Sequence, residues 1–195
     1  MNKISDIDSR LLDDLSLVIL SYNRQDELLN NIIPLCEDSL KTGFELIIVD
    51  HASTDGSREV LVELSNQYPG LRVIYNDKNL GVAEGRNTGW QAATRNFILN
   101  IDDDTRISLM EIIALHQFAI EKPDAGVLSP RILHAITEAA QNDHGDKEYE
   151  PANFHGACHL VRRDVYRKVG AIDPACSFGG EEIDYSIRVR AAGYK

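Results

Sequence analysis

Short runs of hydrophobic residues alternate along the chain with longer segments in which hydrophobic and polar residues recur at helical spacing. The four clearest runs cover residues 15–20, 45–50, 71–76 and 97–101. Each is bounded by polar turn residues, which is typical of strands that are buried on both faces of a sheet. A further strand is expected over residues 125–130.

The segments between these runs are predicted to be helices. Apolar residues recur every three or four positions over residues 25–41, 57–68, 79–95 and 107–121. Pro34 is expected to kink or divide the first helix, because proline lacks a backbone N–H and its ring clashes with the preceding turn.

Strands that alternate with helices predict an α/β fold with a mostly parallel sheet and helices on both faces. In such sheets ligands bind at the carboxyl ends of the strands. Asp50 and Asp102 stand at the ends of two of the predicted strands, so the fold can bring them to one crevice. The polar stretch 134–153 has no periodicity and is expected to be a mobile loop, of the kind that closes over a binding site.

The composition limits the classes of function that fit. With 31 acidic and 20 basic residues the formal net charge is -11, so nucleic acid is not an expected partner. The three cysteines form no C-x-x-C pair, which favours a reducing compartment, here the cytoplasm. No apolar run reaches the roughly 18 residues that a membrane-spanning helix needs, so no transmembrane segment is expected.

The sequence also leads to expectations about the two ends of the folded domain. Residues 1–14 are polar and charged and are assigned to an N-terminal extension, which leaves residues 15–195 for a single domain. The chain stops directly after a helical pattern, so a natural C-terminal part is expected to be missing.

Three consecutive aspartates, Asp102, Asp103 and Asp104, come at the end of the fourth predicted strand. In an extended segment residues i and i+2 point to the same side, so Asp102 and Asp104 could share a hard divalent cation, Mn2+ or Mg2+. Asp103 would point the other way, which is more typical of a structural position. A solvated turn that caps a helix starting near Ser108 explains the three aspartates about as well.

Asp50 ends the second predicted strand in a similar way. Its carboxylate could accept a hydrogen bond from a ligand N–H, such as the N3–H of uracil or thymine. The alternative is that it caps the following turn, a role that suits Asp55 better.

Glycines surround Arg86 in the segment that opens the third predicted helix. Gly81, Gly85 and Gly89 permit close backbone approach, and an arginine beside a helix N-terminus suits a diphosphate. Packing of this helix against a strand explains the glycine spacing equally well.

A cluster of acids, Glu181, Glu182 and Asp184, follows two glycines and leads into a last predicted helix. Acids at a helix start interact favourably with the helix dipole. A carboxylate beside an electrophilic carbon can instead act as a general base towards a hydroxyl group. The sequence leaves both roles open.

Taken together, these segments resemble the family 2 glycosyltransferases, which have the GT-A fold. The resemblance runs in the family's order from about residue 15 to residue 195. The matching segments are LVILSYNR at 17–24, IVDHASTDGS at 48–57, NLGVAEGRNTG at 79–89, the D-x-D motif at 102–104, VGAID at 169–173 and EEIDYSIR at 181–188.

The resemblance implies a metal-dependent transfer of a sugar from a nucleoside-diphosphate sugar, UDP- or dTDP-linked, with inversion at the anomeric carbon. The implied acceptor is a hydroxyl group of a saccharide or a lipid-linked saccharide. Asp50 would read the pyrimidine base, Ser21 and Tyr22 would contact the nucleoside, and Arg86 would lie near the nucleotide. The missing C-terminal part would supply acceptor contacts and would allow peripheral association with a membrane.

The resemblance also divides the acids between roles. Asp102 would handle the ribose and the metal, Asp104 would bind the Mn2+ or Mg2+ directly, and Asp103 is kept among the nucleotide-sugar-binding candidates. Glu182 stands at the position of the catalytic base, where the family usually has aspartate, so Glu181 and Asp184 are alternative bases. His51 and Gly85 are further departures, from a small or polar residue such as Asn and from alanine respectively.

Two other functions fit parts of the pattern. A sugar nucleotidyltransferase also places acids and a metal at strand ends, but it usually carries a glycine-rich loop after the first strand, where this chain has SYNRQ at 21–25. A non-catalytic nucleotide-sugar-binding module would keep a metal-dependent nucleotide site without turnover.

Overall fold

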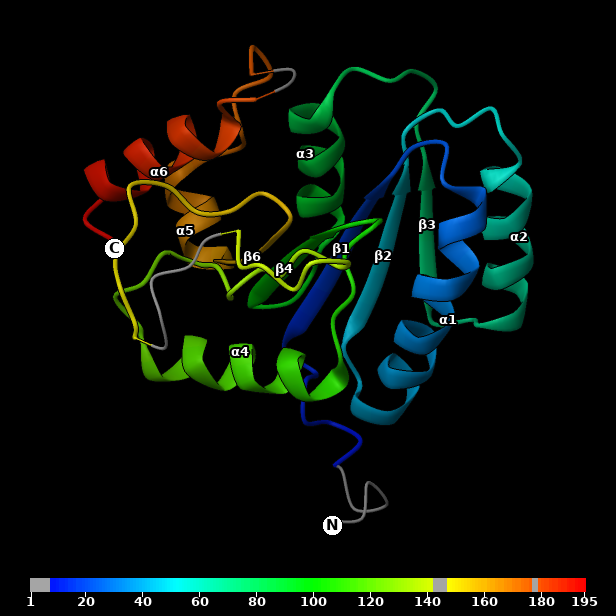
Figure 1. The fold of residues 1–195 in the computed structure, drawn as a ribbon, viewed down its shortest axis with the longest axis horizontal. Helices are drawn as coiled ribbons and strands as arrows, with labels where there is room; N and C mark the ends of the chain where they lie inside the picture. Colours follow the sequence, from blue (N-terminus) through cyan, green and yellow to red (C-terminus); the bar gives the residue numbers. More distant parts are fainter. Residues whose placement is uncertain (1–7, 142–146, 177–178) are drawn as a thin grey trace.

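The structure, a computed structural model, describes residues 8–141, 147–176 and 179–195 (Figure 1). Within these residues the centre is a six-stranded sheet with the strand order β3-β2-β1-β4-β6-β5. β1 to β4 pair in parallel, β6 runs antiparallel to β4, and β5 runs antiparallel to β6. The strands are β1 (Leu15–Ser21), β2 (Glu45–Asp50), β3 (Leu71–Tyr75), β4 (Phe97–Asp102), β5 (Val127–Leu128) and β6 (Cys158–Arg162).

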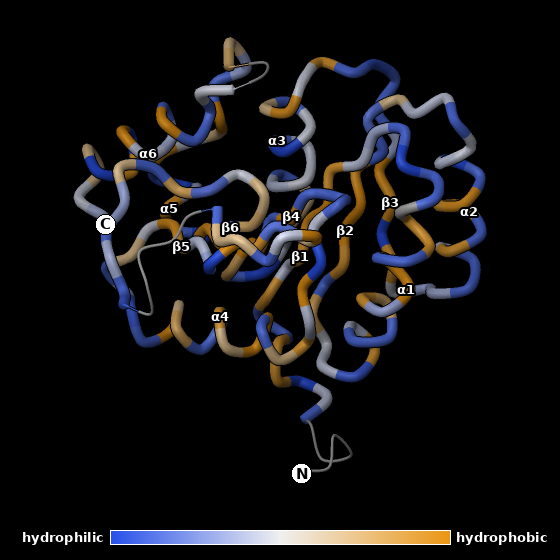
Figure 2. Tube along the Cα trace, in the orientation of Figure 1, coloured by the Kyte–Doolittle hydropathy of each residue, from blue (hydrophilic) through white to orange (hydrophobic). Residues whose placement is uncertain are grey.

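Helices cover both faces of this sheet (Figure 1). α1, α2 and α4 pack on one face and α3, α5 and α6 on the other. Each turns a hydrophobic side towards the strands, which form the apolar centre in Figure 2. The helices are α1 (Gln25–Thr42), α2 (Ser57–Gln67), α3 (Val82–Ala92), α4 (Leu109–Glu121), α5 (Arg163–Val169) and α6 (Glu181–Ala191). The predicted α/β fold with a mostly parallel sheet is confirmed.

The continuous hydrophobic runs arise because both faces of the sheet are covered. On β1, Leu17 and Ile19 belong to the core beneath α1 and α4, whereas Val18 belongs to the core beneath α3. All three side chains are at most 1% exposed. A strand with one solvent-exposed face would instead carry polar residues at every second position.

The structure departs from the hydrophobic pattern at two places. Of the two effects expected of Pro34, the division of α1 is wrong, because the helix continues to Thr42, and the kink stays a prediction. Pro34 lies on the exposed side of the helix, where water can satisfy the carbonyl group that proline leaves without a partner. The pattern also fails to predict β6 and α5, because both are short and rich in polar residues.

The N-terminal segment and the predicted loop 134–153 differ in structure. In the N-terminal segment, the described residues 8–14 pack against it: Leu12 is fully buried and the Phe97 N–H donates to the Asp14 carbonyl at 3.0 Å. In the predicted loop 134–153, the described residues form no helix or strand longer than a single bridge. Residues 1–7 and 142–146 of these segments lie outside the described part. Among the described residues, no helix is both long and apolar enough to cross a bilayer.

Two glycines allow α3 to lie directly on β1. A Cβ atom at Gly89 would collide with Val18, and one at Gly85 would collide with Leu20. The packing interpretation of these glycines is therefore confirmed, and alanine at position 85 would require Leu20 to move. The close approach of α3 places Arg86 beside the end of β4.

Candidate functional site

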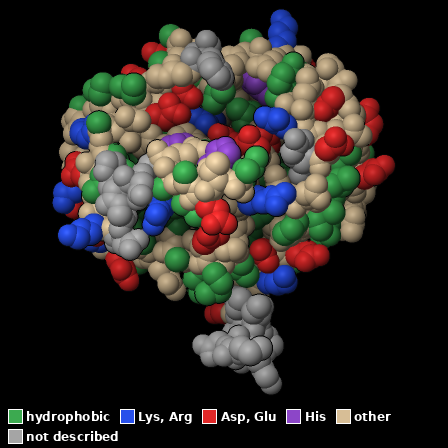
Figure 3. Space-filling view, viewed as in Figure 1, with side chains coloured by type: hydrophobic (Ala, Val, Ile, Leu, Met, Phe, Trp, Pro, Cys, Tyr) green, Lys and Arg blue, Asp and Glu red, His purple; other side chains and the backbone are tan. Residues whose placement is uncertain are grey.

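Polar side chains from distant parts of the chain meet where the parallel strands end. Ser21 on β1 lies opposite Asp50 on β2, and Leu20 lies opposite Asp102 on β4. On the face drawn in Figure 3, acidic, basic and histidine side chains gather near the centre, where Figure 1 places these strand ends. We distinguish a β2 region (Asp50, His51, Arg58 and Asn76) from a β4 region (Arg86, Asp102, Glu181 and Glu182).

In the β2 region, Asp50 is fully buried but only one of its carboxylate oxygens is bonded. Oδ2 accepts hydrogen bonds from Arg58 Nε at 2.7 Å and from the Ser53 N–H at 3.3 Å. No donor among the described residues reaches Oδ1. The contact with Ser53 means that Asp50 also caps the adjoining turn, to which Asp55 contributes by accepting the Ser57 N–H at 3.0 Å. Asp50 therefore keeps a buried acceptor without a partner, which is costly unless a further group donates to it.

His51 joins the end of β2 to the segment before α3. Its Nε2 accepts the N–H of Leu80 at 2.9 Å, and its Nδ1 lies 2.8 Å from the side-chain amide of Asn76. Because Nε2 is an acceptor, the ring is neutral with its proton on Nδ1, and the amide oxygen of Asn76 belongs opposite that proton. Burial lowers the pKa of His51, which favours the same neutral form.

Ser21 and Tyr22 lie between the two regions and differ in access. Ser21 is fully buried, whereas Tyr22 is 45% exposed. The Tyr22 N–H donates to Oδ2 of Asp103 at 3.3 Å, which fixes the backbone at the end of β1. Of the two residues predicted to contact a nucleoside, Tyr22 has the side chain that a ligand can reach.

The three aspartates at the end of β4 do not follow the alternation of an extended segment. The Thr105 N–H donates to the Asp102 carbonyl at 3.0 Å, so the chain already turns there and the expected i, i+2 geometry is wrong. Asp103 lies 3.4 Å from Arg24 and its side chain is 12% exposed. Burial raises the pKa of Asp103 to about 6, an effect that Arg24 opposes. The side chain of Asp104 is 61% exposed and lies 3.7 Å from Arg24.

Helix α4 has its own cap and does not need these aspartates. Ser108 accepts the N–H of Glu111 at 3.3 Å, and the Glu111 carboxylate accepts the N–H of Ser108 at 2.7 Å. The interpretation of the aspartates as a cap for this helix is therefore wrong. The other part of that alternative holds, because the chain forms an acidic turn at Asp103 and Asp104.

No three His, Cys, Asp or Glu side chains in the described part of the chain are already arranged to hold a metal ion. The side chains of Asp102 and Asp104 are nevertheless 37% and 61% exposed. They supply the carboxylate oxygens that Mg2+ and Mn2+ prefer, and diphosphate oxygens or waters can complete such a ligand set. The donor set therefore fits a hard divalent cation that binds together with a phosphate ligand.

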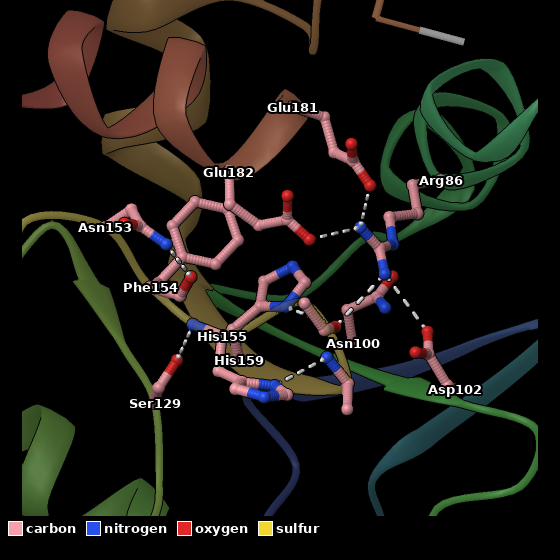
Figure 4. A network of polar contacts seen from close by, with 12 residues as sticks. Arg86, Asn100, Asp102, Ser129, Asn153, Phe154, His155, His159, Glu181 and Glu182 are labelled. Carbon is pink, nitrogen blue, oxygen red and sulfur yellow. Dashed lines mark hydrogen bonds and ion pairs between the residues drawn. The ribbon is translucent and has the colours of Figure 1, made fainter. Parts of the chain in front are cut away.

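Arg86 is the centre of the β4 region (Figure 4). Its side chain is 3% exposed, and Nη1 lies 3.2 Å from Glu181 Oε1 and 3.7 Å from Glu182 Oε1. Nη2 lies 3.1 Å from Asp102 Oδ1 and donates to the Gly156 carbonyl at 3.1 Å. One guanidinium group thus faces three carboxylates from β4 and α6. The pairing of Arg86 with a diphosphate stays a prediction.

The three acids of α6 have different surroundings. The side chain of Glu181 is 5% exposed, and its Oε2 has no hydrogen-bond partner among the described residues. Asp184 is bonded to Arg188 at 2.7 Å within the same helix. The side chain of Glu182 is 21% exposed and also touches the Arg86 cluster. Glu182 therefore combines access from outside with a place in the β4 region.

A buried histidine beside the β4 region was missed by the sequence reasoning. His159 on β6 is fully buried, and its Nδ1 donates to the Gly156 carbonyl at 3.1 Å, the same oxygen that Arg86 contacts. Burial and the neighbouring Arg86 lower its pKa well below the usual range, so the ring is neutral. A prediction of β6 paired with β4 would have found it, because His159 lies opposite Asn100 in that pair.

The sequence pattern of glycosyl transferase family 2 matches residues 16–170. An uncharacterized glycosyltransferase of Haemophilus influenzae is 38% identical over 94 residues, 46% of this chain and 29% of that protein. The putative teichuronic acid biosynthesis glycosyltransferase TuaG of Bacillus subtilis is 27% identical over 107 residues, 55% of this chain and 42% of that protein. The low-salt glycan biosynthesis hexosyltransferase Agl10 of Haloferax volcanii is 21% identical over 212 residues, 94% of this chain and 64% of that protein.

Solved structures share the fold. The mannosyltransferase PcManGT from Pyrobaculum calidifontis, in complex with GDP-Man and Mn2+, has a TM-score of 0.76 at 16% identity over 97% of this chain and 56% of that chain. TarS from S. aureus in complex with UDP-GlcNAc has a TM-score of 0.69 at 18% identity over 90% of this chain and 53% of that chain. At such identities the likeness shows the fold alone. The chain spans less than half the length of the H. influenzae and B. subtilis relatives.

Proposed function

Because the chain belongs to glycosyl transferase family 2, we propose that it transfers a sugar from a nucleoside-diphosphate sugar to a hydroxyl group of an acceptor, with inversion at the anomeric carbon. One observation carries the proposal. A buried unpaired acceptor on Asp50, the aspartates at the end of β4 and a reachable carboxylate on Glu182 all lie at the carboxyl edge of the sheet. A donor that spans base, diphosphate and sugar needs these three chemistries in one place.

The β2 region is proposed to receive the nucleobase. Oδ1 of Asp50 accepts the N3–H of uracil or thymine, which makes UDP- and dTDP-sugars the proposed donors. The neighbourhood of Ser21 and Tyr22 contacts the nucleoside, with the exposed Tyr22 ring as its reachable part.

The aspartates at the end of β4 are proposed to hold Mn2+ or Mg2+ together with the donor's diphosphate. Asp104 is the direct ligand, and Asp102 contacts the metal or the ribose. When bound, the cation supplies positive charge to a diphosphate leaving group. Asp103 holds the turn through Arg24 and the Tyr22 N–H rather than the donor itself.

Glu182 is proposed as the general base. It takes the proton of the acceptor hydroxyl as that oxygen forms a bond to the anomeric carbon. The bond from this carbon to the diphosphate oxygen breaks at the same time, and its electron pair leaves with the diphosphate. Glu181 is more buried and Asp184 is held by Arg188, so both are weaker candidates for the base.

The proposed acceptor is a saccharide or a lipid-linked saccharide. The names of TuaG and Agl10, which refer to teichuronic acid and glycan biosynthesis, support this class of acceptor. Residues 15–195 are proposed to be the catalytic domain of the protein. Membership of the family favours this function over a sugar nucleotidyltransferase.

Thermal-shift measurements with UDP, dTDP, GDP and CMP, each with and without Mn2+, test the proposal. A ligand that binds the native state at a hundred times its Kd stabilises it by about 2.7 kcal/mol. We expect UDP and dTDP to raise the melting temperature in Mn2+ and not in EDTA. Equal shifts in EDTA would remove the metal role of Asp102 and Asp104, and no shift with any nucleotide would overturn the proposed function.

A further inference from the structure

Arg58 connects three elements around the buried Asp50. It lies in the first turn of α2, and its Nε donates to Asp50 Oδ2 at 2.7 Å. Its Nη2 donates to the Asn76 carbonyl directly after β3, and its guanidinium lies 5.6 Å from the centre of the Tyr75 ring. None of the sequence motifs assigns Arg58 a role.

The contacts of Asp50 determine which of its two carboxylate oxygens has no hydrogen-bond donor. Arg58 and the Ser53 N–H both donate to Oδ2, so the carboxylate is held with Oδ1 unbonded. The Asp50 side chain is 0% exposed and that of Arg58 is 38% exposed. Arg58 therefore brings a positive charge from the surface to a carboxylate that has no contact with water. A buried carboxylate stays charged when such a partner is present.

We propose that Arg58 is a positioning residue that sets the base specificity of the donor site, by holding Asp50 as a carboxylate with Oδ1 as an acceptor. This inference rests on the proposed function. A carboxylate only accepts hydrogen bonds. Uracil and thymine present a ring N–H to it, whereas cytosine presents an unprotonated ring nitrogen that the same oxygen repels. The Asp50–Arg58 pair therefore favours UDP over CDP.

The other titratable groups near Asp50 do not replace the charge of Arg58. His51 is buried and neutral, and burial lowers its pKa. Burial raises the pKa of Tyr75 on β3, with Asp50 as a further cause, so this phenol is neutral as well. Glu84 on α3 adds negative charge near His51. Loss of Arg58 therefore leaves the buried negative charge of Asp50 uncompensated.

The test compares Arg58→Gln and Arg58→Lys with the wild-type chain. UDP and CDP binding in Mn2+ is measured by calorimetry from pH 6 to pH 8.5. Arg72→Gln is the matched control, because Arg72 also faces a carboxylate across β2 and β3 (Glu45, 3.8 Å) but at their other end.

We expect Arg58→Gln to weaken UDP binding by about tenfold or more, the usual loss for one hydrogen bond that depends on a charged group. The preference for UDP over CDP narrows, and UDP binding becomes weaker as the pH falls. Arg58→Lys restores part of the affinity, and Arg72→Gln changes neither property. A merely structural role would not alter the base preference or the pH profile.

The outcomes separate the two proposals. If the wild-type chain binds neither nucleotide, the proposed function fails and the inference fails with it. If the wild-type chain binds UDP and Arg58→Gln keeps its affinity, base preference and pH profile, the inference alone is overturned. If circular dichroism shows that Arg58→Gln is unfolded, Arg58→Lys decides, because its single ammonium group replaces the two-sided contact of the guanidinium with Asp50 and Asn76. A fall in both UDP affinity and the UDP to CDP ratio supports the inference, and a fall in UDP affinity with an unchanged ratio overturns it.

Discussion

The β2 and β4 regions lie at the same edge of the sheet but balance charge in opposite ways. In the β2 region one arginine meets one buried carboxylate, and a single acceptor oxygen is left over. In the β4 region Arg86 faces Asp102, Glu181 and Glu182, so negative charge is in excess. The two regions also differ in which partner is exposed: in the β2 region Asp50 is 0% and Arg58 38% exposed, whereas in the β4 region Asp102 is 37% and Arg86 3% exposed.

This difference matches two kinds of chemistry. A buried carboxylate whose charge is balanced by one arginine suits recognition of a neutral hydrogen-bonding group, whose binding changes no charge. A cluster with excess negative charge, in which Asp102 and Glu182 are partly exposed, suits a site where a cation arrives and a proton is taken up. The comparison therefore predicts that changes in the β4 region alter catalysis and stability, whereas changes in the β2 region alter donor affinity.

The largest expected effect is on catalysis in Glu182→Gln. Without a general base, the rate of transfer from a UDP-sugar to a saccharide acceptor should fall by about 10²–10⁴-fold, while UDP affinity stays within about twofold. The rate is followed as UDP release. Glu59→Gln, an exposed acid in the first turn of α2, is the matched control and should keep the wild-type rate. A normal rate in Glu182→Gln together with a loss in Glu181→Gln would move the base to Glu181.

Removal of the buried guanidinium group of Arg86 should cause the largest fall in the free energy of unfolding. Arg86→Gln leaves Asp102 and the buried Glu181 without their partner, a loss of about 3 kcal/mol or more in the free energy of unfolding. Arg188→Gln is the control, since its pair with Asp184 is about one third exposed and such pairs contribute about 0.5 kcal/mol or less. Urea unfolding measures both. Similar losses of unfolding free energy in the two variants would show that Arg86 contributes no more to stability than an exposed ion pair does.

The sequence predicted the elements that position the site better than it predicted the contacts within it. Continuous hydrophobic runs identify β1 to β4, because strands covered on both faces need apolar side chains at every position. The runs alone therefore suffice to place Asp50 and Asp102 at one edge of the sheet. The hydrophobic pattern does not predict the antiparallel β6, because Cys158–Arg162 is short and partly polar. It therefore does not predict the buried position of His159 either.

The contacts depend on distances between elements that no local pattern contains. The sequence suggested a diphosphate partner for Arg86, but its nearest groups are carboxylates from β4 and α6, 16 and 95 residues further along the chain. The alternation of Asp102 and Asp104 failed because the backbone already turns after β4. Arg58 carries no motif, and its importance becomes visible only when α2 is packed beside β2.

The buried histidines give the two regions different sensitivities to acid. Each has a pKa below its usual value, so the unfolded chain takes up a proton on the ring as the pH falls below about 6.5 and the folded chain does not. Stability is therefore lost as the pH falls. For His159, whose pKa is lowered further, the loss should approach about 2 kcal/mol at pH 5. The free energy of unfolding at pH 7 and pH 5 should differ less in His159→Gln than in His51→Gln. The reverse order would contradict the assignment of His159 as the more strongly buried ring.

The smallest expected effect is on donor affinity in Asp50→Asn, which removes the negative charge of Asp50 but keeps the shape of its side chain. UDP affinity should fall about tenfold, the loss of one hydrogen bond to a charged group, while the rate at saturating donor stays near that of the wild type. Asp55→Asn is the control in the same loop, because both oxygens of its carboxylate already accept backbone N–H groups, those of Gln25 and Ser57. It should lower stability by about 1 kcal/mol without changing UDP affinity. A loss of rate rather than affinity in Asp50→Asn would mean that the β2 region also takes part in the transfer, and the division between the two regions would have to be given up.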